Sequence, residues 1–333
     1  MGCSATGGQD KGSSRKCGNG NLRPTPHQWE LALPLYHSET LNCSGQTTGS
    51  CNGDIIEAPV NFSTLSDTYS TFATQFIRNA SSDTTPFFLY VPFSHIHTPQ
   101  YVLTRNVGKS GRAGDAGHFY DTLLELDETV GKIMAATSAD KAVAANTLTW
   151  LSGDNGPWEV KCNLTGSAGP YLGMWQRTQG GGGSASKTTT WEGGHREVGV
   201  AHWPGKIQPR VSDALVSTLD LLPTFLALIN APLPTDRVFD GMDISDVLLH
   251  GSEKGHETLF HPNSGMEGAV MGKLDGVRWM NWKAIYQTGG APDCTGNIGT
   301  IARHDPPLLF DLEKDPAEST ALDTSTEPCL LRC

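Results

Sequence analysis

The stretch PFFLYVPFSHIHTPQ, residues 86–100, decides the fold class. It opens with a continuous apolar run that is short enough for one buried strand, and such runs are typical of parallel sheets covered on both faces. NTLTWLSGD (146–154) is a second run of this kind, and GVAHWPG (199–205) is a shorter one. We predict a buried strand in each of the three segments.

Helical patterns alternate with these runs. Large apolar side chains recur three or four positions apart over residues 63–80 and 118–136, which marks one face of a helix. The expected stripes are Leu65, Tyr69, Phe72 and Phe76 in the first segment, and Phe119, Leu123, Leu126, Val130 and Ile133 in the second. A third helix is expected over 213–229, where Pro223 either kinks it or lies in its first turn. Strands alternating with helices predict an α/β fold with a doubly wound sheet.

Composition divides the chain into three regions. Residues 1–54 are polar and rich in Gly, Ser and Cys, and we interpret them as loop. Residues 55–238 carry the α/β pattern and form the expected central domain. Residues 239–333 change to short strands separated by turns, which predicts a small antiparallel sheet subdomain. Within the central domain, QGGGGSAS (179–186) has the composition of a mobile loop.

Charge and hydropathy exclude two classes of partner. The 24 Lys and Arg against 35 Asp and Glu give a net charge of −11, and basic residues do not cluster, so we expect no nucleic-acid partner. No run of about 18 apolar residues occurs, so we expect no transmembrane segment. The N-terminal stretch also lacks the apolar centre of a signal peptide. The sequence leaves the oligomeric state open.

Cysteines and glycosylation motifs nevertheless indicate the secretory pathway. The eight cysteines contain no C-x-x-C pair, which favours disulfides over a zinc ribbon or a redox motif. Four N-x-S/T acceptor motifs occur, at Asn42, Asn61, Asn79 and Asn163. Together they predict a glycoprotein of the lysosome or the extracellular space.

Polar residues follow the predicted strands, where ligands bind in open α/β sheets. Asp154 and Asn155 offer oxygen ligands for calcium or magnesium, although the pair is also a common turn. His95 and His97 lie at i and i+2, so in an extended segment they point to the same side, either as pocket groups or as strand caps. Lys187 is either a charge for an anionic substrate or a solvated surface lysine.

The order of these motifs resembles the sulfatase family, in particular the arylsulfatases. PFFLYVPFSHIHTPQ, ELDETVGKI, NTLTWLSGDNGPW, KTTTWEGGHR and HWPG follow one another as they do in that family. The resemblance implies an alkaline-phosphatase-like fold and hydrolysis of sulfate esters, of a sulfated sugar or an aryl sulfate. It assigns Asp154 and Asn155 to a calcium ion, and His97 and Lys187 to the sulfate group. His95 matches no functional position, and we expect it either to support a site residue from behind or to be structural.

The resemblance also identifies what this sequence does not contain. The family's nucleophile is a formylglycine made from C/S-x-P-S-R, and neither that motif nor an Asp-Asp pair occurs. We therefore expect a sulfatase sequence without its N-terminal segment, inactive as written and with exposed strand edges. The alternatives are a non-catalytic isoform that binds sulfated ligands or a full-length partner, and a phosphoester hydrolase of the same superfamily. The resemblance further implies a disulfide between Cys162 and Cys294, with Cα atoms within about 7 Å.

Overall fold

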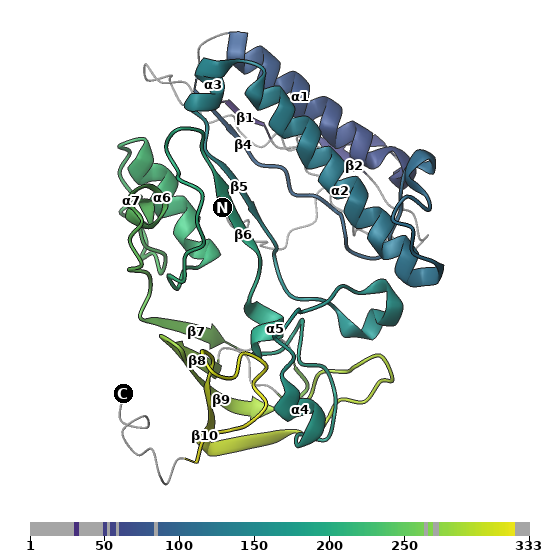
Figure 1. Ribbon diagram of the computed structural model, residues 1–333, viewed down its shortest axis with the longest axis vertical. Helices are drawn as coiled ribbons and strands as arrows, with labels where there is room; N and C mark the ends of the chain where they lie inside the picture. The colour runs from purple at the N-terminus through teal and green to yellow at the C-terminus, as the bar shows by residue number, and fades with distance from the viewer. Residues whose placement is uncertain are drawn as a thin grey trace, which may run out of the picture.

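Short strands lie between two groups of helices in a computed structural model (Figure 1). The structure describes residues 30–32, 49–51, 54–57, 60–82, 86–262, 266–268 and 273–323. The central strands are β1 (Glu30–Ala32), β4 (Phe87–Leu89), β5 (Thr149–Ser152) and β6 (Gly199–His202). Helices α1 (Leu65–Ser82) and α2 (Gly114–Ser138) flank them on one side, and α6 (Leu221–Leu228) and α7 (Ser245–His250) on the other. Helices on both sides of the strands are the arrangement of an α/β fold.

The pairing of the central strands differs in part from the predicted parallel sheet. β1 pairs with β4 in parallel, but β5 and β6 pair antiparallel, with Ser152 opposite Gly199. A parallel crossover needs a connecting element that packs on the sheet. The chain between β5 and β6 holds only the short helices η3 (Glu159–Leu164), α4 (Met174–Thr178) and α5 (Glu192–His195), and it returns beside β5.

Part of the region predicted as loop forms strands. β1 lies within residues 1–54, and β2 (Gly49–Cys51) pairs antiparallel with β3 (Asp54–Glu57). The third predicted helix is shorter than expected. It begins with η4 (Thr218–Asp220), which Ser217 caps, and Pro223 lies in the first turn of α6. The remaining described helices are η1 (Phe62–Thr64), η2 (Thr104–Asn106) and α3 (Lys141–Ala145).

Helices α1 and α2 form where predicted, but their buried faces include polar residues. Leu65, Tyr69 and Phe119 are buried as expected, whereas Phe72 and Leu123 are exposed. Two acidic residues of α2, Asp121 and Glu125, are buried instead. The predicted apolar stripe is therefore wrong in part.

Backbone hydrogen bonds explain why those carboxylates are buried. Asp121 accepts hydrogen bonds from the backbone N–H groups of Gly108 (2.6 Å) and Ser110 (2.8 Å). Glu125 accepts from the N–H of Leu103 at 2.7 Å and from the side-chain amide of Asn106 at 3.0 Å. A loop packed on a helix needs acceptors for its buried N–H groups, and α2 supplies them as carboxylates.

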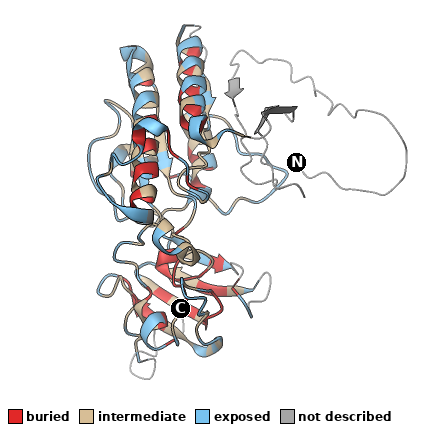
Figure 2. Ribbon diagram, turned by 90° about the vertical axis from the view of Figure 1, so that its right-hand side faces the viewer, coloured by how far each residue is buried: buried red, intermediate tan, exposed pale blue. Residues whose placement is uncertain are grey.

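The C-terminal subdomain matches its prediction. Strands β7 (Thr258–Pro262), β8 (Leu274–Trp279), β9 (Trp282–Thr288) and β10 (Ala302–Asp311) form an antiparallel sheet in the order β10-β9-β8-β7. Figure 2 shows buried positions in this sheet as well as along the long helices. A tight apolar cluster joins this sheet to the chain just before α5, and it consists of Ala185, Trp191, Ile285, Phe310 and Leu312.

The glycine-rich segment 179–186 is a packed loop, contrary to its compositional prediction. Ala185 and Ser186 are almost fully buried, and the Gln176 side-chain amide donates to the carbonyl oxygens of Gly180 (3.0 Å) and Gly182 (2.7 Å). A Cβ on Gly183 would lie 2.7 Å from the backbone of Ile298. The glycines therefore permit close backbone contact in this segment.

Candidate functional site

The GDNG segment continues directly from β5. The N–H of Gly153 donates to the carbonyl of Val198 at 3.3 Å, which extends the β5–β6 ladder by one step. Asp154 is exposed, and one of its carboxylate oxygens accepts from the N–H of Asn155 at 2.8 Å. The Asn155 amide donates to the carbonyl of Gly156 at 3.1 Å. Within the described residues, Asp154 Oδ2 and Asn155 Oδ1 accept no hydrogen bond.

Packing explains the two glycines that flank the Asp-Asn pair. A Cβ on Gly153 would lie 2.0 Å from Oε2 of Glu197, and a Cβ on Gly156 would lie 1.9 Å from the carbonyl oxygen of Gly193. Any side chain at either position would displace the group packed against it. The pair is thus held between β6 and α5.

Glu197 lies beside the GDNG segment, and the sequence did not single it out. Burial and the neighbouring charge of Asp154 raise the pKa of Glu197 to about 7. Its position depends on the antiparallel pairing of β5 with β6, and the sequence pattern did not predict that pairing.

Three basic side chains lie around the indole of Trp158. The sequence did not predict this arrangement. The ammonium of Lys161 lies 4.4 Å from the Trp158 ring centroid and that of Lys187 lies 5.3 Å from it. The ring of His97 has its centroid 5.8 Å from that of Trp158. The structure thus brings together His97 and Lys187, which are 90 positions apart, and the N–H of Lys187 donates to the carbonyl of Pro157 at 3.1 Å.

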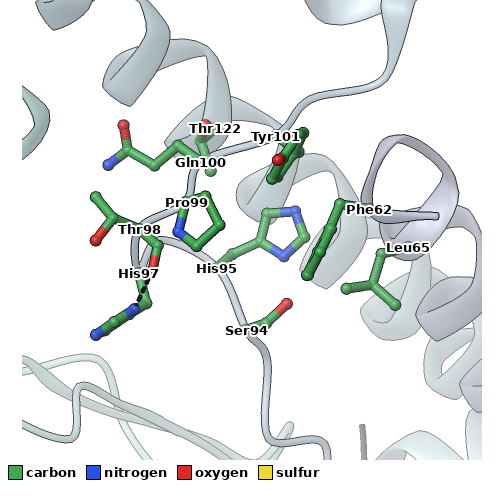
Figure 3. Close-up of a pocket in the computed structure, with 10 residues that line it drawn as sticks. All are labelled: Phe62, Leu65, Ser94, His95, His97, Thr98, Pro99, Gln100, Tyr101 and Thr122. Atoms are coloured by element: carbon green, nitrogen blue, oxygen red, sulfur yellow. Dashed lines mark hydrogen bonds between the residues drawn. The ribbon is translucent and has the colours of Figure 1, made fainter. Parts of the chain in front are cut away.

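His95 and His97 do not point to the same side. The chain turns here, since the N–H of His97 donates to the carbonyl of Ser94 at 3.1 Å, and Figure 3 shows the two rings directed apart. The His95 side chain is only 5% exposed, and its Nε2 lies 3.2 Å from the buried Glu125 carboxylate. His95 also lines a small pocket with Phe62 (Figure 3). These contacts give His95 a structural position, away from Trp158.

Comparison with known proteins identifies the family. The sulfatase family model matches residues 35–231, and the model of the C-terminal region of aryl-sulfatase matches residues 254–330. The chain belongs to the sulfatase family. It is 44% identical over 330 residues to Arylsulfatase G of Canis lupus familiaris, covering 97% of this chain and 57% of that relative. The chain thus spans little more than half the length of that sulfatase.

Solved structures agree with the assignment. The PsFucS1 sulfatase from Pseudoalteromonas sp. superposes with a TM-score of 0.68 at 26% identity, over 80% of this chain and 51% of that one. A protein described under the metabolism of multiple glycosaminoglycans by Bacteroides thetaiotaomicron gives a TM-score of 0.65 at 26% identity, over 86% and 58% of the two chains. The fold is therefore the alkaline-phosphatase-like α/β fold of sulfatases, with the C-terminal antiparallel sheet.

A disulfide joins the loop after the GDNG segment to the C-terminal subdomain of this sulfatase chain. Cys162 and Cys294 are bonded, and their Cα atoms lie 4.9 Å apart. The bond links the segment that carries Trp158 to the loop after β9.

The side chains of the GDNG segment are of the type that binds calcium, but they supply only part of a coordination shell. Carboxylate and amide oxygens are the donors that calcium prefers, and it takes six to eight of them. In the described part of the chain, no group of three or more His, Cys, Asp or Glu side chains is placed to hold a metal ion. Within the described residues, Asp154 and Asn155 alone therefore do not complete a calcium coordination shell.

Three of the four predicted glycosylation positions can be located. Asn61, Asn79 and Asn163 are exposed, which glycan attachment requires. Asn42 lies outside the described residues. No helix in the described ranges is long and apolar enough to cross a membrane.

Proposed function

We propose that this sulfatase chain carries the sulfate-binding half of an arylsulfatase-type site, for a sulfuric ester hydrolase. The convergence of Lys187, Lys161 and His97 on Trp158, next to the Asp154–Asn155 turn, is the observation that supports this function. Two ammonium groups and an imidazole attract a sulfate ester, and an indole face accommodates a sugar or aryl ring.

Each residue has a distinct role in this proposal. Lys187 neutralises a sulfate oxygen. His97 donates from Nδ1 to the carbonyl of Thr98 at 2.6 Å, so it donates a second hydrogen bond, from Nε2 to another sulfate oxygen, when its ring is protonated. Asp154 and Asn155 hold calcium, which when bound supplies positive charge that polarises the sulfate group. Stabilising charge at the sulfur centre is the usual means of accelerating such an ester transfer.

The nucleophile has to come from a C/S-x-P-S-R motif, which the 333 residues do not contain. We therefore propose that these residues alone bind sulfate esters without turning them over. The presence of both Lys187 and His97 also favours the second candidate function, a non-catalytic chain that binds sulfated ligands.

Substrate, compartment and domain division belong to the same proposal. The substrate class is a sulfated glycan or an aryl sulfate, which the likeness to a protein of glycosaminoglycan metabolism supports. Exposed acceptor asparagines and the Cys162–Cys294 disulfide support a glycoprotein of the lysosome or the extracellular space. We also propose that residues 55–238 and 239–333 are the domain and its subdomain.

Binding of 4-nitrophenyl sulfate, measured by calorimetry on the 333-residue chain, tests the proposal. K187M should weaken binding roughly tenfold or more, because a charge-assisted hydrogen bond contributes about 1.5–3 kcal/mol. K206M is the matched control, since Lys206 is exposed and outside the site. Equal affinities of the wild type and K187M would refute the assigned sulfate site. Release of 4-nitrophenol that D154A abolishes would refute the proposed lack of turnover.

A further inference from the structure

We propose that Lys161 binds a second anionic group of the substrate, so that the site prefers a sulfate ester with a further negative charge over a singly charged one. This inference rests on the proposed function, because it adds a subsite to the proposed sulfate site. The roles given there to Lys187 and His97 leave the Lys161 ammonium unassigned. That ammonium lies closer to the Trp158 ring centroid than the Lys187 ammonium does.

The charges of Lys161 and Lys187 are not neutralised by a neighbouring carboxylate. Both residues are partly buried, and neither forms an ion pair within the described part of the chain. The nearest carboxylate along the chain from Lys161 is Glu159, and it is already engaged. Its Oε1 accepts hydrogen bonds from the hydroxyl of Ser186 at 2.5 Å and from the guanidinium of Arg177 at 2.6 Å. Two ammonium groups beside one indole therefore create a positive potential that attracts more than one anionic group.

The two ammonium groups approach the indole from different backbone segments. The N–H of Lys187 donates to the carbonyl of Pro157 at 3.1 Å, which joins its backbone to the chain between Asn155 and Trp158. Lys161 follows Trp158 by three positions, and its N–H donates to the Trp158 carbonyl at 3.0 Å in the turn of η3. Along this segment, Lys187 is thus attached on the side of the proposed calcium ligands and Lys161 on the other side of Trp158. A sulfate group held by Lys187 beside those ligands leaves Lys161 for a second group.

A covalent bond holds the backbone of Lys161 in this place. Cys162 directly follows Lys161, and its disulfide with Cys294 ties this segment to the loop after β9. Both ammonium groups lie within 5.3 Å of the same Trp158 ring centroid, so their separation suits two charged substituents of one ring or one disaccharide. A segment fixed before binding loses little freedom when the ligand binds. The ligand that fits is a sulfated sugar or aryl ring with a second anionic substituent, which the indole face contacts.

Calorimetry with two matched ligands on the 333-residue chain tests the proposal. In 4-carboxyphenyl sulfate a carboxylate replaces the nitro group of 4-nitrophenyl sulfate, so the two ligands differ by one negative charge. The wild type should bind 4-carboxyphenyl sulfate about fivefold more tightly, which is the upper end for a partly exposed ion pair. K161M should lower that ratio to nearly one, while the Kd of 4-nitrophenyl sulfate stays within twofold of the wild type. K161R keeps the charge and should retain the preference.

Two further variants separate this proposal from the sulfate site on which it rests. K206M, which removes an exposed lysine outside the site, should change neither Kd. K187M should raise the Kd of both ligands, since both carry the sulfate ester. If K187M does so, equal affinities of the wild type for the two ligands, or an equal loss of both in K161M, would overturn the assignment of Lys161 alone. Unchanged Kd values of both ligands in K187M would overturn both this proposal and the sulfate site of the proposed function.

Discussion

Replacement of Glu318 by glutamine should change how the stability of this sulfatase chain depends on pH. The Glu318 side chain is fully buried where α4 and α5 meet the C-terminal sheet. Its Oε2 accepts a hydrogen bond from the N–H of Glu192 at 2.9 Å, and its Oε1 is buried without a hydrogen-bond partner among the described residues. Burial raises the pKa of Glu318 to about 8, against the opposing charge of Lys283.

The direction of this pH dependence follows from how tightly the folded and the unfolded chain bind the proton of Glu318. A carboxyl group whose pKa is raised in the folded protein holds its proton more tightly there than in the unfolded chain. Its contribution to stability is complete below the ordinary pKa of 4.5 and is lost as the pH rises from 4.5 toward 8. From pH 4.5 to pH 7 the loss is about 3 kcal/mol, at about 1.4 kcal/mol per unit.

Neighbouring groups act in other pH ranges or with the opposite sign. Burial would raise the pKa of Glu192, but Lys283 at 2.8 Å and Arg278 at 2.9 Å lower it to about 2. The stabilising contribution of Glu192 is therefore lost only as the pH falls below 4.5. Burial lowers the pKa of His261, which makes stability rise with pH. Only the difference between E318Q and the wild type therefore isolates Glu318.

The assay is urea denaturation followed by fluorescence, at intervals from pH 4.5 to pH 7.5. The unfolding free energy of E318Q relative to the wild type should increase by about 3 kcal/mol between pH 4.5 and pH 7. E313Q, which removes an exposed carboxylate nearby, should show no such increase. A constant difference between E318Q and the wild type would mean that Glu318 is ionised in the folded chain, and the reasoning would be wrong.

Three further changes test the packing of the chain. Replacing Cys162 and Cys294 by serine should lower the unfolding free energy by about 2–5 kcal/mol in denaturant, because the bond closes a loop of 132 residues. Phe310→Ala should cost about 3–5 kcal/mol in the same assay, since the ring is fully buried in the core of the C-terminal sheet. Val200→Lys should increase the monomeric fraction in size-exclusion chromatography, because Val200 is 49% exposed on the β5–β6 pair, whereas Val211→Lys should not.

The sequence was sufficient for the existence and type of most elements, because hydrophobic periodicity follows local geometry. The sequence was not sufficient where polar side chains accept hydrogen bonds from backbone N–H groups that are distant in the sequence. The burial of Asp121 and Glu125 depends on loop N–H groups at 103–110, and no periodic pattern within α2 encodes that contact. Leu123 is exposed for the same reason. The helix face that carries the carboxylates packs on the loop, so the face with Leu123 does not.

For the candidate site, the motifs singled out individual residues but did not predict how those residues meet. His97 and Lys187 were each ambiguous alone, and only the fold shows them beside one indole. Trp158 was not predicted to lie in the site, because an aromatic residue after a turn is usually interpreted as a core residue. Glu197 was hidden for another reason, since its place beside Gly153 depends on β5 and β6 being antiparallel.

The position of Lys187 depends on the C-terminal sheet as well as on its own domain. Two positions before it, Ala185 lies in the apolar cluster with Ile285 and Phe310, and four positions after it Trp191 lies in the same cluster. Both ends of this short segment are therefore fixed by residues of β9 and β10. The Lys187 ammonium reaches Trp158 from a segment held in this way, so the two regions matched by separate family models are packed together beside it. Loss of the C-terminal sheet should therefore release the lysine that we propose to bind sulfate.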